Sequence, residues 1–285
     1  MIIVDYSGVA IANLFAMRIS VSEGLVRHCI LNSLRLYNAK YRREYGQMVL
    51  ACDGGGTWRR EMFPQYKASR KAARESGDID WKEFFRILGN VRDEIRENLP
   101  FKVVHLQGVE ADDIIATLTD STQEFGKHEP VMIISSDKDF VQLHRYKNVR
   151  QYSPMAKEFV KEKDPVRYLQ EHVLRGDTGD GVPNVLSPDD VFVSGGRQTP
   201  LRAKLMDEWI SNWDSLQTKM TTEQYRNFQR NQALIDLTKI PSAKKTEIIN
   251  TFESVKPASN TLNYLVEKRC SQLIECAEEF NTVSL

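Results

Sequence analysis

The chain has 285 residues, of which 41% are hydrophobic and 27% are charged, and its 39 basic residues balance its 39 acidic ones. That length suits one large domain or two small ones with a substantial core. Neither a signal peptide nor a membrane-spanning helix is expected, because Asp5 follows directly on the first four residues and no apolar run approaches the roughly 20 residues that a bilayer requires.

Short apolar runs alternate with longer amphipathic ones along the first half of the chain, which is typical of βαβ units around a parallel sheet. The expected strands are Ile2–Val4, Gln47–Cys52, Lys102–Leu106 and Val131–Ser135. The expected helices are one opened by the capping pattern Ser20-x-x-Glu23, then Trp81–Leu99 and Ala111–Phe125. We therefore predict an α/β core, with a mostly parallel central sheet flanked by helices, over residues 1–175.

From about residue 176 the strand signals fade and the pattern becomes helical, ending in a long amphipathic segment over Thr261–Phe280. We predict a helical C-terminal region over residues 176–285 that binds DNA. The four cysteines form no CxxC pair, so reduced thiols in a cytoplasmic protein are expected and a zinc site is not.

Residues 54–80 interrupt the alternation with a basic and aromatic insertion between a strand and a helix. Such insertions are more often functional loops than core. Zero net charge argues mildly against a nucleic-acid-binding protein, but the charge is segregated, and this insertion carries Arg59, Arg60, Lys67, Arg70, Lys71 and Arg74. The basic side chains could follow backbone phosphates, and Trp58, Phe63 and Tyr66 could stack on bases. A solvated basic helix is the alternative.

Three expected strands end at or just before an aspartate, namely Asp5, Asp53 and Asp137. Ligands of open α/β sheets bind at the carboxyl ends of the strands. Glu110, Asp112 and Asp113 stand at the start of a helix, where simple capping could also explain acidic residues. Further acids follow on turns, at Asp139 and at Asp177 and Asp180.

So many carboxylates in one crevice would repel one another unless protons or cations neutralised them. The sequence places no histidine or cysteine nearby to share ligation, so a hard cation, Mg²⁺ or Mn²⁺, is the expected counter-charge. Two such ions beside a basic arm are typical of phosphodiester hydrolysis. Lys67 or Arg70 could neutralise the charge that develops on the scissile phosphate.

At this point the motifs match a known family. The chain resembles the flap endonuclease / 5′-nuclease superfamily, and within it most closely the ribonuclease H of T-even-type bacteriophages. Besides Asp5 and Asp53, the resemblance is carried by Tyr66-Lys67-Ala68-Ser69-Arg70, Val109-Glu110-Ala111-Asp112-Asp113, Ser135-Ser136-Asp137-Lys138-Asp139 and Gly176-Asp177-Thr178-Gly179-Asp180-Gly181.

The resemblance implies a 5′→3′ exonuclease and flap endonuclease that acts on DNA and on RNA/DNA hybrids with 5′ ends or flaps, and removes RNA primers during phage DNA replication. It implies a PIN-like core with a helical arch over residues 54–80, with Lys67 and Arg70 beneath the arch. One Mg²⁺ is expected near Asp5, Asp53, Glu110 and Asp112. A second is expected near Asp137, Asp139, Asp177 and Asp180, and Asp113 could serve either ion.

The resemblance also implies a monomer in the infected bacterial cell, working with a phage single-stranded-DNA-binding protein and a sliding clamp. After Pro183 the sequence departs from the pattern, because Asn184–Asp190 stands where relatives carry a second glycine hairpin. The sequence leaves open whether this region grips duplex DNA or holds K⁺.

Two other functions are compatible with parts of this pattern. A PIN-domain endoribonuclease has a similar acidic crevice but is usually about half as long and lacks the arm. A DNA-structure-binding scaffold derived from a nuclease is the non-enzymatic alternative, but such a protein should have lost acidic ligands, and here every expected carboxylate is present.

Overall fold

The computed structural model describes residues 1–17, 21–70, 77 and 79–281. At its centre lies a six-stranded sheet in the order β3-β2-β1-β4-β5-β6. All neighbouring strands are parallel except the pair β5 and β6, which is antiparallel. The strands are β1 (Ile2–Asp5), β2 (Met48–Cys52), β3 (Lys102–His105), β4 (Val131–Ile134), β5 (Val149–Ser153) and β6 (Glu158–Val160).

Helices connect the strands and form the C-terminal region. Those of the first 175 residues are α1 (Tyr6–Met17), α2 (Glu23–Tyr45), α3 (Trp58–Met62), α5 (Trp81–Asn98), α6 (Ala111–Ser121), the 3₁₀ segments η1 (Glu124–Gly126) and η2 (Lys138–Arg145), and α7 (Pro165–Arg175). Those that follow are α8 (Ala203–Ser211), η3 (Trp213–Ser215), α9 (Leu216–Lys219), α10 (Thr222–Ile235), η4 (Leu237–Lys239), α11 (Ser242–Ser254), α12 (Thr261–Glu267), α13 (Ser271–Ile274) and η5 (Ala277–Phe280).

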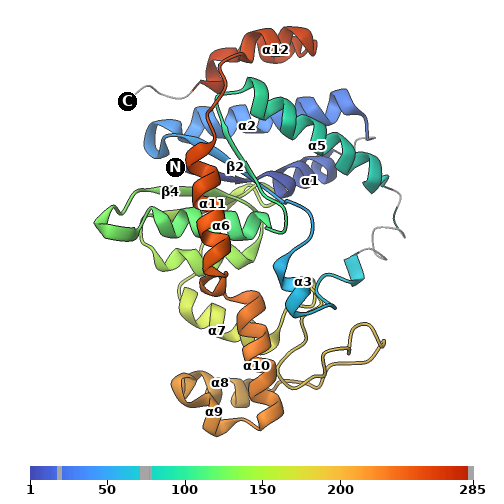
Figure 1. Ribbon diagram of the computed structural model, residues 1–285, viewed down its shortest axis with the longest axis vertical. Coiled ribbons are helices and arrows are strands. Elements are labelled where there is room, and N and C mark those ends of the chain that lie inside the picture. Colours follow the sequence, from blue (N-terminus) through green and yellow to red (C-terminus); the bar gives the residue numbers. More distant parts are fainter. Residues whose placement is uncertain (18–20, 71–76, 78, 282–285) are drawn as a thin grey trace.

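The two faces of the sheet are covered by different helices, as Figure 1 shows. Side chains of β1 alternate between the faces, so that Ile2 and Val4 join a core with α1, α2 and α5 while Ile3 joins a core with α6 and α11. All three side chains are fully buried. Burial on both faces explains why these strands are almost entirely apolar.

The C-terminal half contributes to three cores. Helices α7 to α10 enclose a third apolar cluster, which includes Trp209 and Phe228 and also takes Phe63 and Tyr66 from the 54–80 insertion. Helix α11 packs on the α6 face through Ile248, and the last described segments return to the α2 and α5 face through Tyr264 and Phe280. The lower end of the molecule in Figure 1 is therefore the helical cluster, and α12 lies at the opposite end.

The predicted fold class, a mostly parallel α/β sheet flanked by helices, is confirmed, and the four expected strands lie within one residue of their observed ends. The sequence reading missed α1, α7 and the pair β5–β6. The segment over Thr261–Phe280, expected as one amphipathic stretch, is broken into α12, α13 and η5, and Arg269, with a φ of 54°, separates the first two. Helix α2 begins at Glu23 with Ser22 as its N-cap; the expected capping residue, Ser20, lies outside the described residues.

The proposed division at residue 175 remains a prediction. Within the described residues no helix is long and apolar enough to cross a membrane.

Candidate active site

The carboxyl ends of β1, β2 and β4 carry the three aspartates expected at this edge. Parallel pairing aligns the three strand ends, so Asp5, Asp53 and Asp137 emerge close together. Asp5 accepts hydrogen bonds from the Gly8 amide at the start of α1 and from the Ser135 hydroxyl, both at 2.8 Å. A helix N-terminus and a hydroxyl thus fix this carboxylate at the edge of the sheet.

Asp53 is positioned by a close approach of two chain segments. The amide of Gly54 donates to the carbonyl of Val109 at 2.9 Å, and a Cβ at this glycine would lie 1.4 Å from the carbonyl oxygen of Leu106. Only glycine allows this contact. It brings Asp53 to the start of α6, where its carboxylate accepts from the Ala111 amide at 3.0 Å.

The three acids at the start of α6 have different surroundings. Asp113 is fully buried, accepts from the indole of Trp58 at 3.1 Å and the amide of Glu110 at 3.1 Å, and pairs with Arg59 at 2.8 Å. Its carboxylate completes a capping box with Glu110 and stabilises the helix start. This arrangement does not support the expected ligand role of Asp113, whereas Glu110 and Asp112 remain next to the strand ends.

Two further acids follow β4. The Asp137 carboxylate caps η2 by accepting from the Asp139 amide at 2.9 Å. Asp137 is exposed and Asp139 is half-buried. We refer to the acids that the strand ends and the helix starts gather here as the acidic edge: Asp5, Asp53, Glu110, Asp112, Asp137 and Asp139.

The loop after α7 supplies Asp177 and Asp180. Gly176 has a φ of +69° and lies so close to the carbonyl of Val182 that a Cβ would approach it to 2.3 Å. Asp177 then accepts from the Asp180 amide at 3.0 Å. The expected pair of loop carboxylates is thus held in a tight turn, with Asp180 almost buried.

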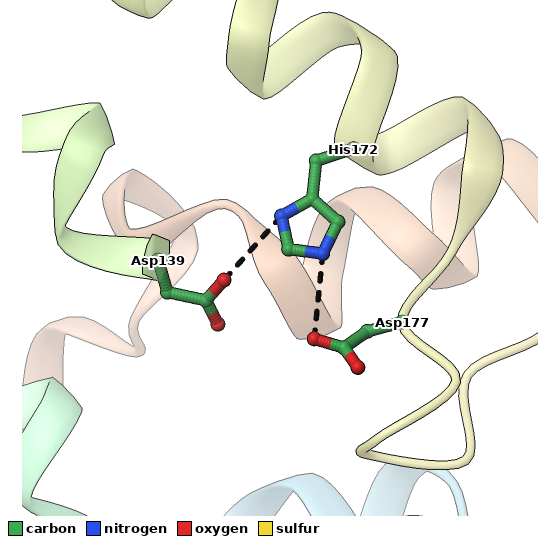
Figure 2. A group of neighbouring side chains, drawn as sticks. All are labelled: Asp139, His172 and Asp177. Atoms are coloured by element: carbon green, nitrogen blue, oxygen red, sulfur yellow. Dashed lines mark ion pairs between the residues drawn. The ribbon is translucent and has the colours of Figure 1, made fainter. Parts of the chain in front are cut away.

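His172 was missed by the sequence analysis, which expected no histidine near the acids. It lies in the last turn of α7 between Asp139 and Asp177, at 3.4 Å and 3.3 Å from their carboxylate oxygens (Figure 2). The signal available in the sequence was weak, a histidine four residues before Gly176, where the Gly176-Asp177 turn begins. These three side chains form the one group of metal-binding residue types found close enough to share an ion, among the residues that the structure describes.

Burial and mutual repulsion raise the pKa values of several acids at the acidic edge. Burial, together with the negative charges of Asp53 and Asp137, raises the pKa of Asp5 to about 6. Burial also raises the pKa of Asp139 to about 7, with Asp137 adding to the effect. The pKa of Asp112 lies well above its usual value, through burial and then through Asp137. Such unneutralised carboxylates are a donor set that fits hard divalent cations.

Cations of the 54–80 insertion meet this edge from the other side. Lys67 has a φ of 56°, and its ammonium lies 2.6 Å from Glu110 and 3.5 Å from Asp180. Burial alone would raise the pKa of Glu110, but Lys67 and Arg59 more than offset burial and hold that pKa below its usual value. Arg70 pairs with Asp180 and remains 44% exposed.

Several residues expected to contact nucleic acid are placed differently. Arg59 is 2% exposed and is held by Glu110, Asp113 and the carbonyl of Leu234. Tyr66 is also buried and donates to Asp180 at 2.8 Å. Both side chains are buried and their polar groups are bonded inside the protein, so the described conformation does not place either of them to contact a phosphate or stack on a base.

Trp58 and Phe63 are likewise buried and cannot stack on bases here. Arg60 is exposed and donates to the carbonyl of Tyr66 at 3.1 Å. Lys71 and Arg74 lie outside the described residues. We refer to residues 58–70, which contain the described part of the insertion's charge, as the basic segment.

A cavity of about 730 Å³ is lined by residues of both the acidic edge and the basic segment. Its acidic wall includes Asp53 and Glu110, and its basic wall includes Arg60, Lys67 and Arg70. A cavity with carboxylates on one side and cations on the other can hold metal ions and a phosphate at once.

Family models account for almost the whole chain. Residues 1–173 match the 5′-3′ exonuclease N-terminal resolvase-like domain, and residues 167–280 match the C-terminal domain of T4 RNase H. The chain belongs to the 5′-3′ exonuclease family. The resemblance seen in the motifs is thereby confirmed, and this 5′-nuclease is an enzyme that hydrolyses phosphodiester bonds.

Relatives of this 5′-nuclease include phage and bacterial proteins. It is 32% identical to the ribonuclease H of Enterobacteria phage T4, over 98% of this chain and 95% of that protein. It is 30% identical to a 5′-3′ exonuclease of Buchnera aphidicola, over 45% of this chain and 44% of that protein. The match to the phage protein thus covers both the N-terminal and the C-terminal half of this chain, whereas the match to the bacterial exonuclease covers less than half of it.

Solved structures share the fold. A bacteriophage T5 5′-exonuclease with bound divalent zinc ions superposes with a TM-score of 0.62 at 16% identity, covering 90% of this chain and 98% of that chain. The T5 flap endonuclease in a pseudo-enzyme-product complex with DNA and metal ions gives 0.61 at 19% identity, covering 97% and 98%.

Proposed function

We propose that this 5′-nuclease is a Mg²⁺-dependent 5′→3′ exonuclease and flap endonuclease that acts on DNA/DNA and RNA/DNA duplexes. The observation that carries the proposal is the cavity in which Asp53 and Glu110 face Lys67 and Arg70. Membership of the 5′-3′ exonuclease family and similarity to a phage ribonuclease H support the same activity. Its biological role is then removal of lagging-strand RNA primers in phage DNA replication.

Two ions are assigned to the acidic residues. Asp5, Asp53, Glu110 and Asp112 would hold the first, and Asp137, Asp139, Asp177 and Asp180 the second. When bound, the ions activate an attacking water and stabilise the leaving oxygen. Mn²⁺ should substitute for Mg²⁺, because both accept carboxylate oxygens.

Two cations of the chain, Lys67 and Arg70, are proposed to stabilise the negative charge that develops on the phosphate. Lys67 and Arg70 now neutralise Glu110 and Asp180. With metal ions held at Glu110 and Asp180, Lys67 and Arg70 would be free to turn toward the phosphate and stabilise the charge that develops during cleavage. This exchange of partners is why we assign Lys67 and Arg70 to catalysis and exposed Arg60 to backbone contacts.

Lys71 and Arg74 belong to the same proposed nucleic-acid surface by their charge. We also propose that the enzyme works as a monomer in the cytoplasm of an infected bacterial cell, together with a single-stranded-DNA-binding protein and a sliding clamp. Neither a PIN-domain endoribonuclease nor a non-catalytic scaffold is favoured, because the family match includes both halves of the chain and the acidic edge is intact.

The test uses 5′-labelled DNA flaps, nicked DNA/DNA duplexes and RNA/DNA hybrids with the full chain. With Mg²⁺, release of short 5′-terminal products from all three substrates is expected, together with cutting near the base of the flap. EDTA should abolish both reactions. Cleavage of single-stranded RNA alone would favour the PIN-type alternative, and binding of flaps without any cutting in Mg²⁺ or Mn²⁺ would favour the scaffold.

A further inference from the structure

The histidine at the end of α7 lies between two carboxylates that come from different elements. Asp139 is at the start of η2, His172 is in the last turn of α7, and Asp177 is in the loop that follows (Figure 2). Each residue offers one ligand atom, and these atoms all lie within 4.8 Å of one another. We call these three residues the His172 cluster.

The two ring nitrogens have different environments. Nε2 lies 3.3 Å from Oδ2 of Asp177, where its N–H can be donated to the carboxylate. Nδ1 is buried, lies 3.4 Å from Oδ1 of Asp139 and has no hydrogen-bond partner. Buried polar atoms rarely remain without a partner, so this nitrogen is the atom of the cluster that lacks one.

The ring is also held in orientation. The Tyr168 ring, one turn earlier on α7, contacts the imidazole edge-on at a centroid distance of 6.0 Å. The hollow in front of the imidazole is lined by Asp137, Asp139, Asp177 and the glycine-rich loop. Nδ1 faces Asp139 rather than solvent. In the neutral ring, donation of the Nε2–H to Asp177 would leave the lone pair on Nδ1, where it could bind a cation.

We propose that His172 is a ligand of the second divalent ion through Nδ1, and that Asp177, one of the carboxylates assigned to that ion, also accepts from Nε2 through Oδ2. This inference rests on the proposed function, which places an ion beside Asp139. The consequence is a mixed nitrogen and oxygen site. Imidazole suits transition metals such as Mn²⁺ and Co²⁺ better than it suits Mg²⁺ or Ca²⁺, so the second site prefers Mn²⁺ where the first, built from carboxylates alone, does not.

A metal-binding measurement tests the ligand directly. The full chain is loaded with Mn²⁺ and studied by pulsed electron paramagnetic resonance, which detects the nuclear spin of a nitrogen bound to the ion. A ¹⁴N coupling is expected in the wild type, and it should change to a ¹⁵N pattern when only the histidines carry ¹⁵N. This labelling experiment needs no substitution, so it shows whether a histidine binds the ion even if a variant does not fold.

Substitution gives the second measurement. In His172→Gln the nitrogen coupling should disappear and Mn²⁺ affinity at one of two sites should fall by about tenfold or more, with a smaller change in Mg²⁺ affinity. His28→Gln is the matched control, because His28 is also a half-buried histidine on a helix but lies on α2. It should keep the coupling and both affinities.

Two results would overturn the inference. One is Mn²⁺ bound to the wild type without a histidine nitrogen coupling. The other is an equal loss of Mn²⁺ and Mg²⁺ affinity in His172→Gln, which would mean that the imidazole only positions Asp139 and Asp177. A wild type that cuts flaps in Mg²⁺ but lacks the coupling refutes this inference alone, whereas a clear coupling without any cutting refutes the proposed function alone.

Discussion

Residues of the acidic edge and of the basic segment line one cavity, but the protein holds the two groups in place by different means. The acids follow strand ends or helix starts, where backbone amides and hydroxyls fix them, as at Asp5 and Asp53. The cations are ordered by the acids themselves, as Lys67 is by Glu110. The acids are thus placed by the fold, and the cations by charges that metal ions would later neutralise.

The largest expected effect removes one acid from the edge. Asp53→Asn and Asp137→Asn should each lower the cleavage rate at saturating flap DNA by about 1,000-fold, or about 4 kcal/mol, while DNA binding is retained because negative charge is lost. Asparagine is nearly isosteric and still accepts the capping bonds at these positions. Asp214→Asn, at an exposed site in η3, is the control and should cut normally.

Retention of more than about a tenth of the wild-type rate in either variant, on the scale where 1.4 kcal/mol is tenfold, would remove that residue from the essential ligands. The acidic edge would then not be the set of essential metal ligands that the comparison assumes.

The next effect concerns the buried cation of the basic segment, Arg59, and its contribution to stability. Arg59→Ala should lower the free energy of unfolding by about 3–5 kcal/mol, because it removes the cation paired with the fully buried Asp113 and leaves Glu110 with Lys67 as its remaining ion-pair partner. Urea denaturation measures this. Arg60→Ala, one residue on and exposed, should unfold like the wild type but bind DNA more weakly, with a salt dependence reduced by about one phosphate contact.

If Arg59→Ala were as stable as Arg60→Ala and showed the same loss of salt dependence, Arg59 would be a phosphate contact after all. The assignment of Arg59 to the protein interior and of Arg60 to DNA contacts would then be wrong.

A smaller effect is expected where the two regions meet. Lys67→Ala should lower the single-turnover rate at saturating DNA by about 100-fold, in the range of other lost electrostatic stabilisers, and change affinity far less. Arg70→Ala should have a weaker effect, because this side chain is 44% exposed. The control is Lys219→Ala, at an exposed position of α9. If Lys67→Ala cleaved at the wild-type rate at saturating DNA, the basic segment would act only as an electrostatic guide for DNA binding.

The smallest expected effect concerns two acids of the acidic edge whose pKa values are raised, Asp5 and Asp139. The pKa values of Asp5 and Asp139 are raised to about 6 and about 7, so these groups bind protons more tightly in the folded state. Their contribution to stability is present at low pH and is lost as the pH rises through those values. Between about pH 5.5 and pH 8 the metal-free protein should lose about 1–3 kcal/mol, at roughly 1.4 kcal/mol per pKa unit.

Thermal unfolding in EDTA across that range is the measurement. Saturating Mg²⁺ should flatten the profile, because the ion replaces the protons. Asp5→Asn should flatten it in part, since the amide mimics the protonated acid and can still cap α1. An unchanged slope in both cases would mean that other groups set the pH dependence.

The sequence could predict the acidic edge because the positions of its residues follow from secondary structure. An aspartate after a buried β1, β2 or β4 strand has to emerge at the same edge once the strands are parallel. The basic segment could not be predicted equally well, because charge density does not reveal burial. Arg59 and Arg60 are identical neighbours in sequence, yet one is inside the protein and the other on its surface.

Other parts of the site and fold also lacked a sequence signal. His172 reaches the acids only through the packing of α7 against η2, which joins segments with no recognisable spacing between them. Helix α1 begins at the residue after β1 and is mostly apolar, so neither a turn nor a polar face marks it. The break after α12 depends on the left-handed backbone conformation of Arg269. An arginine in the sequence gives no indication of this conformation, which is more usual for glycine.

The return of the last segment to the sheet also determines when the protein can finish folding. Phe280 is fully buried in the same core as Ile2, and Asn38 on α2 donates to the carbonyls of Glu279 and Asn281 at 2.8 and 3.1 Å. During synthesis, β1 and α2 therefore leave the ribosome long before the residues that cover them. This face of the sheet therefore stays partly uncovered, and exposed to aggregation, until residues 264–281 have been translated.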